Sequence, residues 1–220
     1  MRTTVGAACL VALLAAAPAA VDLALDANDV AAAIALGQSR IERDRVRFHQ
    51  PYRTIVGKAP LDYIDIVTPF RRVVIAAEAS VLAGDRTFGQ RKALELAAAT
   101  DLELDIIAEL TFHPLNNYVG VPAYTIRLEH RGPGSDPRAP VSGVRPRTFE
   151  LIPRYGMRVD GAPPSGSGGI TPGKSQPLLG GALIAHFDGK TLDATGAYDV
   201  VIGEAGKELA RARVNLAALR

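Results

Sequence analysis

The stretch from residue 102 to residue 112 alternates between apolar and other side chains, and this pattern limits the possible folds most strongly. The apolar positions are Leu102, Leu104, Ile106, Ala108, Leu110 and Phe112. The positions between them are Glu103, Asp105, Ile107, Glu109 and Thr111. Successive side chains of a β-strand point to opposite faces, so a period of two predicts a long strand with one buried and one solvated face.

Glu103 and Asp105 lie on the polar face of this predicted strand. A carboxylate becomes an acid–base catalyst when burial raises its pKa. Because the alternation places both side chains on the solvated face, we expect a solvated pair and not a catalytic one.

The rest of the chain predicts helices in the N-terminal half and strands in the C-terminal half. Helices are expected at 30–36 with Asn28 or Asp29 as the N-cap, from Pro69 to Gly84 with Thr68 as the N-cap, and at 90–99. Strands are expected at 62–67, 124–130, 148–152, 182–188, 197–202 and 207–216. We expect 124–130 to be the antiparallel neighbour of 102–112. This order predicts an α+β fold in which N-terminal helices pack on a predominantly antiparallel sheet or β-sandwich.

The predicted organisation has three parts: a signal peptide at 1–20, an N-terminal helix with a charged connector at 21–58, and an α+β body at 59–220. The connector carries Arg40, Arg43, Arg45 and Arg47 among Glu42 and Asp44. Acids interrupt the arginines and no aromatic residue precedes Phe48, so we expect a solvated, partly helical face. Flexible loops are expected at 131–144 and 160–177, which are rich in proline, glycine or serine.

Residues 181–217 resemble the closing strands of immunoglobulin-like or fibronectin type III-like β-sandwiches. The resemblance depends on Leu192 and on the run from Gly196 to Ile202, which includes Tyr198. It implies a structural role for Tyr198, whose hydroxyl group would bond nearby backbone. Those folds also contain paired cysteines and a buried tryptophan, which this sequence lacks, so the resemblance suggests a fold and no function.

The first twenty residues predict a secretory signal peptide. Arg2 precedes an apolar run from Val5 to Ala17, and Ala17 and Ala19 provide the small residues that precede a cleavage site after Ala19 or Ala20. Cleavage would remove the only cysteine, Cys9, and would lower the 25 lysines and arginines to 24 against 23 acidic residues. We therefore expect an exported protein, in the periplasm or outside the cell, without disulfides and without a stable membrane span.

No motif in the sequence predicts a catalytic residue, a metal ligand or a cofactor. Residues 168–175 match the phosphate-loop pattern, but no strand precedes them and Pro177 opposes a following helix, so we expect no nucleotide binding. The histidines are His49, His113, His130 and His186, and their spacing is not that of a local metal motif. The near-neutral charge also argues against nucleic-acid binding.

The loop from His113 to Pro122 is the candidate binding site. It combines an imidazole, two amides and an aromatic ring with stiffening prolines, and its candidate binding residues are His113, Asn116, Asn117 and Tyr118. The alternative is a structural loop that packs Tyr118 and Leu115 on the core.

We expect a non-enzymatic binding or structural module whose partner is a protein or an envelope component. One alternative is an exported hydrolase or metal-dependent enzyme with a site near His113 and His130. Another is a structural subunit that offers an edge strand to a partner.

Overall fold

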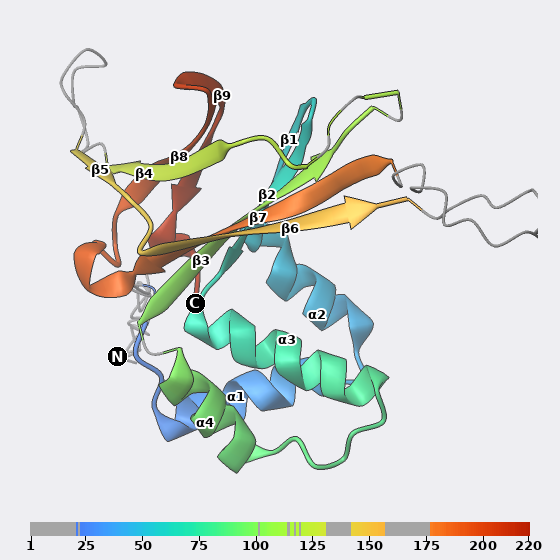
Figure 1. The fold of residues 1–220 in the computed structure, drawn as a ribbon. Coiled ribbons are helices and arrows are strands. Elements are labelled where there is room, and N and C mark those ends of the chain that lie inside the picture. The colour runs from blue at the N-terminus through green and yellow to red at the C-terminus, as the bar shows by residue number, and fades with distance from the viewer. Residues whose placement is uncertain are drawn as a thin grey trace, which may run out of the picture.

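The computed structural model describes residues 21, 23–100, 102–113, 115–116, 118, 120–130, 142–156 and 177–220. Figure 1 shows three layers in this part of the chain: a four-stranded sheet, a five-stranded sheet and a group of helices below it. The α+β fold predicted from the sequence is confirmed, with helices packed on antiparallel sheets. The predicted signal peptide and the phosphate-loop match both lie outside the described residues.

The described residues form four α-helices and nine strands. The helices are α1 (Ala27–Gly37), α2 (Glu42–His49), α3 (Pro69–Leu82) and α4 (Gln90–Ala99). The strands are β1 (Arg53–Lys58), β2 (Leu61–Val67), β3 (Glu103–Thr111), β4 (Tyr124–His130), β5 (Ser142–Val144), β6 (Thr148–Tyr155), β7 (Leu178–Asp188), β8 (Ala197–Glu204) and β9 (Lys207–Asn215). Short 3₁₀ turns lie at Gln50–Tyr52, Gly189–Thr191 and Leu216–Ala218.

Two antiparallel sheets face each other across the main core. Sheet A has the order β1-β2-β3-β7-β6, and sheet B has the order β5-β4-β8-β9. The alternating apolar side chains of β3 and β7 pack between the sheets, against those of β4, β8 and β9. The predicted strand at 102–112 is therefore confirmed, and one of its two faces fills the centre of the molecule.

The helices build a second, smaller core on the other side of sheet A. This core consists of Val30 and Ala33 of α1, Phe70, Val73 and Val74 of α3, and Ala93 of α4. The predicted Thr68 cap of α3 is confirmed, because its hydroxyl accepts a hydrogen bond from the Arg71 backbone N–H at 3.2 Å. The N-cap of α1 is Asp26 and not Asn28 or Asp29, because the Asp26 carboxylate accepts the backbone N–H groups of both.

Three predictions about strands were wrong or incomplete. Strand β4 is not the neighbour of β3, since it pairs with β5 and β8 in sheet B. Alternation reports which face of a strand is apolar, and it does not distinguish strands that pair side by side from strands that stack across a core. Strand β5 lies at the end of the expected loop at 131–144, and β1 lies where only a helix and a connector were expected.

Arg220 connects sheet B to the helical layer. Its backbone oxygen accepts hydrogen bonds from the Tyr52 hydroxyl at 2.8 Å and from the Thr68 hydroxyl at 2.6 Å. Its guanidinium lies over the Phe70 ring and pairs with Asp29 of α1 at 3.0 Å. Within the described residues, no helix is both long and apolar enough to cross a membrane.

Candidate functional site

The described part of the predicted binding loop is closed on itself. The Asn116 side chain donates to the backbone oxygens of His113 at 2.7 Å and Leu178 at 2.8 Å, and its own oxygen accepts the Tyr118 N–H at 2.8 Å. The Tyr118 ring packs edge-on against buried Phe112. Leu115 is 83 % exposed, so the expected packing of this side chain on the core is wrong. Asn117 lies outside the described residues, and a binding role for this loop stays a prediction.

His113 and His130 belong to separate surroundings. His113 follows the end of β3, where its Nδ1 accepts the Leu115 N–H at 3.2 Å. His130 ends β4 in the other sheet and packs on the Tyr198 ring. Among the described residues, the one group of three metal-ligating side chains contains neither of these histidines.

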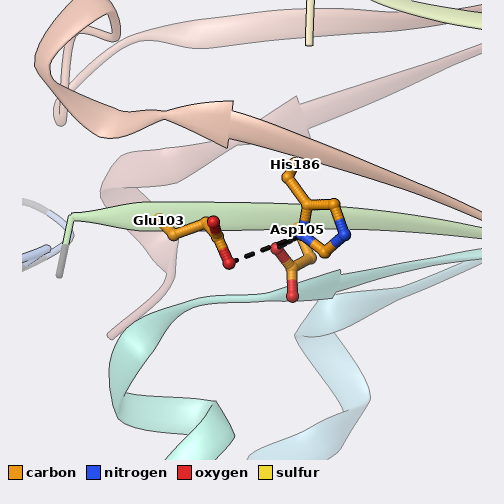
Figure 2. A group of neighbouring side chains, drawn as sticks. All are labelled: Glu103, Asp105 and His186. Atoms are coloured by element: carbon orange, nitrogen blue, oxygen red, sulfur yellow. Dashed lines mark hydrogen bonds and ion pairs between the residues drawn. The ribbon is translucent and has the colours of Figure 1, made fainter. Parts of the chain in front are cut away.

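That group consists of Glu103 and Asp105 of β3 and His186 of β7 (Figure 2). The strand register places Asp105 directly opposite His186. The His186 Nδ1 lies 2.8 Å from Asp105 Oδ1 and 3.4 Å from Glu103 Oε1. Because an ionised carboxylate only accepts hydrogen bonds, the Nδ1 of His186 donates to Asp105.

Asp105 is buried, contrary to the prediction of a solvated acid pair. Its residue surface is 8 % exposed, while Glu103 is half-buried. The second face of β3 is polar but not open at this end, because Arg72 of α3 covers it. Arg72 Nη2 lies 2.6 Å from Asp105 Oδ2 and 3.4 Å from Glu103 Oε1.

Two nitrogen atoms in and beside this group are buried without a hydrogen-bond partner: His186 Nε2, and Nη1 of the neighbouring Arg72. The Glu150 carboxylate of β6 lies 3.7 Å from His186 Nε2. Buried polar atoms without partners are costly, so the hydrogen-bonding capacity of these two nitrogen atoms is unmet in the structure.

A second polar network lies on the opposite flank of α3. Arg71 donates to Asp65 of β2 at 2.7 Å, and Arg53 of β1 donates to the other oxygen of this carboxylate at 2.8 Å. Burial alone would raise the pKa of the Asp65 carboxyl, but the hydrogen bonds and charges of Arg71 and Arg53 outweigh it and lower that pKa.

This network also fixes the tautomer of His49. Arg71 Nε donates to His49 Nδ1 at 3.2 Å, so the ring proton of neutral His49 is on Nε2. The Nε2 group then donates to Glu78 of α3 at 3.0 Å. Both ring nitrogens of His49 are therefore occupied by protein groups.

A groove of about 700 Å³ lies above this network, between α2, α3 and β1. We call it the α2–α3 groove. Its exposed apolar side chains come from three elements: Val46 (60 % exposed), Ile55 (71 %) and Ile75 (38 %). Its other lining residues are Glu42, Arg45, His49, Gln50, Arg53, Asp65, Arg71 and Glu78.

Sequence reasoning did not find either network, because their members are far apart along the chain. His186 and Asp105 are 81 residues apart and meet only through the register of β3 and β7. One signal was present: Arg71 and Arg72 are adjacent at the start of a helix whose apolar face excludes them. Such a pair can place one cation on each flank of the helix, and here both cations reach carboxylates of sheet A.

A comparison of the chain with protein-family models, with curated proteins and with solved structures finds no match. The function is therefore inferred from the geometry of the two networks and the groove.

Proposed function

We propose that this chain is an exported, non-enzymatic binding module that holds an acidic segment of a partner protein, with apolar side chains, in the α2–α3 groove. The observation that carries the proposal is the uncovered apolar wall of this groove above a polar floor whose charges are already paired. Export and the signal peptide stay part of the proposal, and the likeness of residues 181–217 to immunoglobulin-like sandwiches is compatible with a binding role.

The state of the histidines supports a role other than catalysis. A general base needs a ring nitrogen that can reach the proton of a substrate. Both nitrogens of His49 are engaged by Arg71 and Glu78. In His186, Nδ1 is engaged by Asp105, and Nε2 has no exposed surface. The alternative is a hydrolase or metal-dependent enzyme with a site near His113 and His130. The described contacts of these two histidines are with different parts of the chain, so they do not support a shared site.

The apolar wall supports a polypeptide partner. Helix α2 buries none of its residues, and its Val46 lines the groove together with Ile55 and Ile75. Single exposed apolar side chains are common on protein surfaces, whereas a group from three elements around one groove is typical of an interaction site.

The charge around the groove supports an acidic partner. The carboxylates of its floor, Asp65 and Glu78, are already paired with Arg71, Arg53, His49 and Arg45. Helix α2 adds the exposed Arg43 and Arg47, and Arg40 lies two residues before the helix. The lining of the groove holds three arginines and three carboxylates. Together with the rest of α2 and the segment before it, this region carries six arginines and four carboxylates, counting Glu42 and Asp44.

The edge-strand alternative has a specific obstacle at β6. The Gly189 N–H donates to the Leu102 oxygen, and the Phe112 N–H donates to the Leu179 oxygen. The backbone N–H and C=O groups of odd-numbered residues along β7 therefore point toward β3. The backbone groups of even-numbered β7 residues point the other way, toward the even-numbered residues of β6 with which they pair. The backbone of odd-numbered β6 residues, which include Pro153, therefore points to the free edge of the sheet. Proline has no N–H to offer to an added strand there.

The proposal is tested with synthetic fluorescein-labelled peptides and the purified protein. Three short probes are compared: alternating glutamate and leucine, glutamate and serine, and lysine and leucine. Fluorescence anisotropy should detect binding of the first probe alone, and high salt should weaken this binding.

Two variants locate the binding site. Val46→Asp should weaken binding of the glutamate–leucine peptide by about tenfold, which corresponds to about 1.4 kcal/mol. The matched control is Leu82→Asp, at the far end of α3, where the side chain is 88 % exposed, and it should leave binding unchanged. Equal binding of the lysine–leucine peptide, or an unchanged affinity of Val46→Asp, would refute the proposal.

A further inference from the structure

The group of Glu103, Asp105 and His186 has the donor types of a transition-metal site. It offers one imidazole nitrogen and two carboxylate oxygens, and these ligand atoms all lie within 4.8 Å of one another. Imidazole together with carboxylates suits zinc and similar divalent ions better than calcium or magnesium, which prefer oxygen ligands alone.

The distances come close to those of a bound ion. Tetrahedral zinc with bonds of about 2.0 to 2.1 Å holds its ligand atoms about 3.3 Å apart. The distance from His186 Nδ1 to Glu103 Oε1 is 3.4 Å. The distance from His186 Nδ1 to Asp105 Oδ1 is 2.8 Å, so an ion there would require these two atoms to separate by roughly half an ångström.

The charge of the surroundings favours a cation. Within the described chain, Arg72 is the single lysine or arginine that pairs with Glu103 or Asp105. Two further carboxylates lie nearby: the register places Asp188 opposite Glu103, and Glu150 approaches His186. The carboxylates therefore outnumber the guanidinium groups at a half-buried position, where uncompensated charge is costly.

The remaining contacts match the outer shell of a metal site. A histidine that binds a metal through one nitrogen donates its other N–H group to a carboxylate or a carbonyl oxygen. If Nδ1 binds an ion, Nε2 carries the proton, and the Glu150 carboxylate, now 3.7 Å away, would accept its hydrogen bond after a small shift of the exposed Glu150 side chain. This role would give a partner to Nε2, which has none in the structure. Arg72 would continue to hold the second oxygen of Asp105.

We propose that Glu103, Asp105 and His186 bind one divalent transition-metal ion, for which Zn²⁺ is the best match. Binding displaces the proton that His186 Nδ1 donates to Asp105, and in the neutral ring this proton passes through the solvent to Nε2, so the imidazole stays neutral. Glu103 is the most exposed of the three side chains, at 30 %, so we expect solvent to reach the ion from the side of Glu103. This inference is independent of the α2–α3 groove, which lies on the other flank of α3.

The test measures Zn²⁺ binding to the full protein, freed of any affinity tag and of metal by dialysis against a chelator. Calorimetry or competition with a chromophoric chelator should give one Zn²⁺ per chain. Co²⁺ should give the visible absorption of a tetrahedral site, and an excess of Ca²⁺ should not displace Zn²⁺.

Three variants locate the ion. His186→Gln and Glu103→Gln should each weaken Zn²⁺ binding at least tenfold, whereas His113→Gln, in an exposed loop, should keep the wild-type affinity. Circular dichroism checks the fold of each variant. If His186→Gln does not fold, Glu103→Gln decides the result, because a partly exposed side chain can be replaced with little effect on folding. Absence of stoichiometric binding, displacement by Ca²⁺, or equal affinity of Glu103→Gln and wild type would overturn the proposal. Val46→Asp should retain Zn²⁺ binding, so failure here is distinguishable from failure of the groove.

Discussion

Tyr198 and Tyr124 are both buried in the main core, and their hydroxyl groups have opposite surroundings. The Tyr198 hydroxyl accepts a hydrogen bond from the Asp193 backbone N–H at 2.6 Å, as the resemblance of this segment implies. The Tyr124 hydroxyl is buried without a partner. Burial, and then the charge of Glu204, raise the pKa of Tyr124 to about 12.

Removal of each hydroxyl group should therefore change the stability differently. Tyr198→Phe leaves the Asp193 N–H without its acceptor and should lower the free energy of unfolding by about 1 kcal/mol. Tyr124→Phe removes an unpaired polar atom and should leave that free energy unchanged or raise it by up to about 1 kcal/mol. Urea denaturation of the two variants measures the difference, and an equal loss in both would contradict this interpretation.

Single residues were predictable where a local rule determines them. The capping bond of Thr68 and the hydroxyl bond of Tyr198 involve neighbours within five residues, so these two roles follow from the sequence. Asp105 was misjudged because its burial depends on Arg72, which reaches it from a helix 33 residues earlier. No local pattern reports such a contact.

At the level of elements, the turn between β8 and β9 shows a mismatch between residue and conformation. Glu204 pairs with Lys207, so Ala205 and Gly206 form a two-residue hairpin loop. Both have positive φ angles, 49° at Ala205 and 80° at Gly206. A glycine adopts this conformation without cost, whereas an alanine does so unfavourably.

Ala205→Asn should raise the free energy of unfolding by about 0.5 to 1 kcal/mol, because asparagine tolerates a positive φ better than alanine. Ala205→Val should lower it, because a β-branched residue is strongly disfavoured there. Thermal unfolding followed by circular dichroism checks both variants. Equal melting temperatures for all three proteins would show that the turn does not limit stability.

Elements were predictable from pattern, and their partners were not. Pro69 and Gly84 delimit α3 as expected, and alternation identifies β3 and β4. The strand β1, by contrast, has an apolar side chain, Ile55, directed to solvent, so its sequence shows no buried face. The partner of β4 depends on the path of the loop before it, which carries no periodic signal.

At the scale of the whole molecule, Asp65 links the helical layer to sheet A. Its carboxylate binds Arg71, whose side chain is only 4 % exposed, and Arg53. The pKa of Asp65 in the folded protein is lowered below 3.8. As the pH falls, Asp65 therefore takes up its proton at a higher pH in the unfolded chain than in the folded protein. The stabilisation by this carboxylate is present above about pH 4 and is lost as the pH falls through the lowered pKa of the folded protein.

Asp65→Asn leaves a buried arginine without its acid and should lower the free energy of unfolding at neutral pH by about 3 kcal/mol. The difference from wild type should shrink as the pH falls through the lowered pKa of Asp65, because the wild-type carboxyl then also becomes neutral. Urea denaturation at several pH values measures both curves. A difference that does not change with pH would contradict the assignment of the loss to this charge.

The contacts of Arg220 also set the order in which the molecule can be completed during synthesis. Tyr52 and Thr68 emerge from the ribosome early, yet their hydroxyl groups bond a backbone oxygen that is made 168 and 152 residues later. Strand β9 is equally late and is the edge partner of β8. The nascent chain therefore lacks its last strand and its final link between the layers until translation reaches Arg220. A polypeptide of this kind stays incompletely folded for most of its synthesis. This property is compatible with the export that we propose, because passage through a narrow translocation channel requires an unfolded chain.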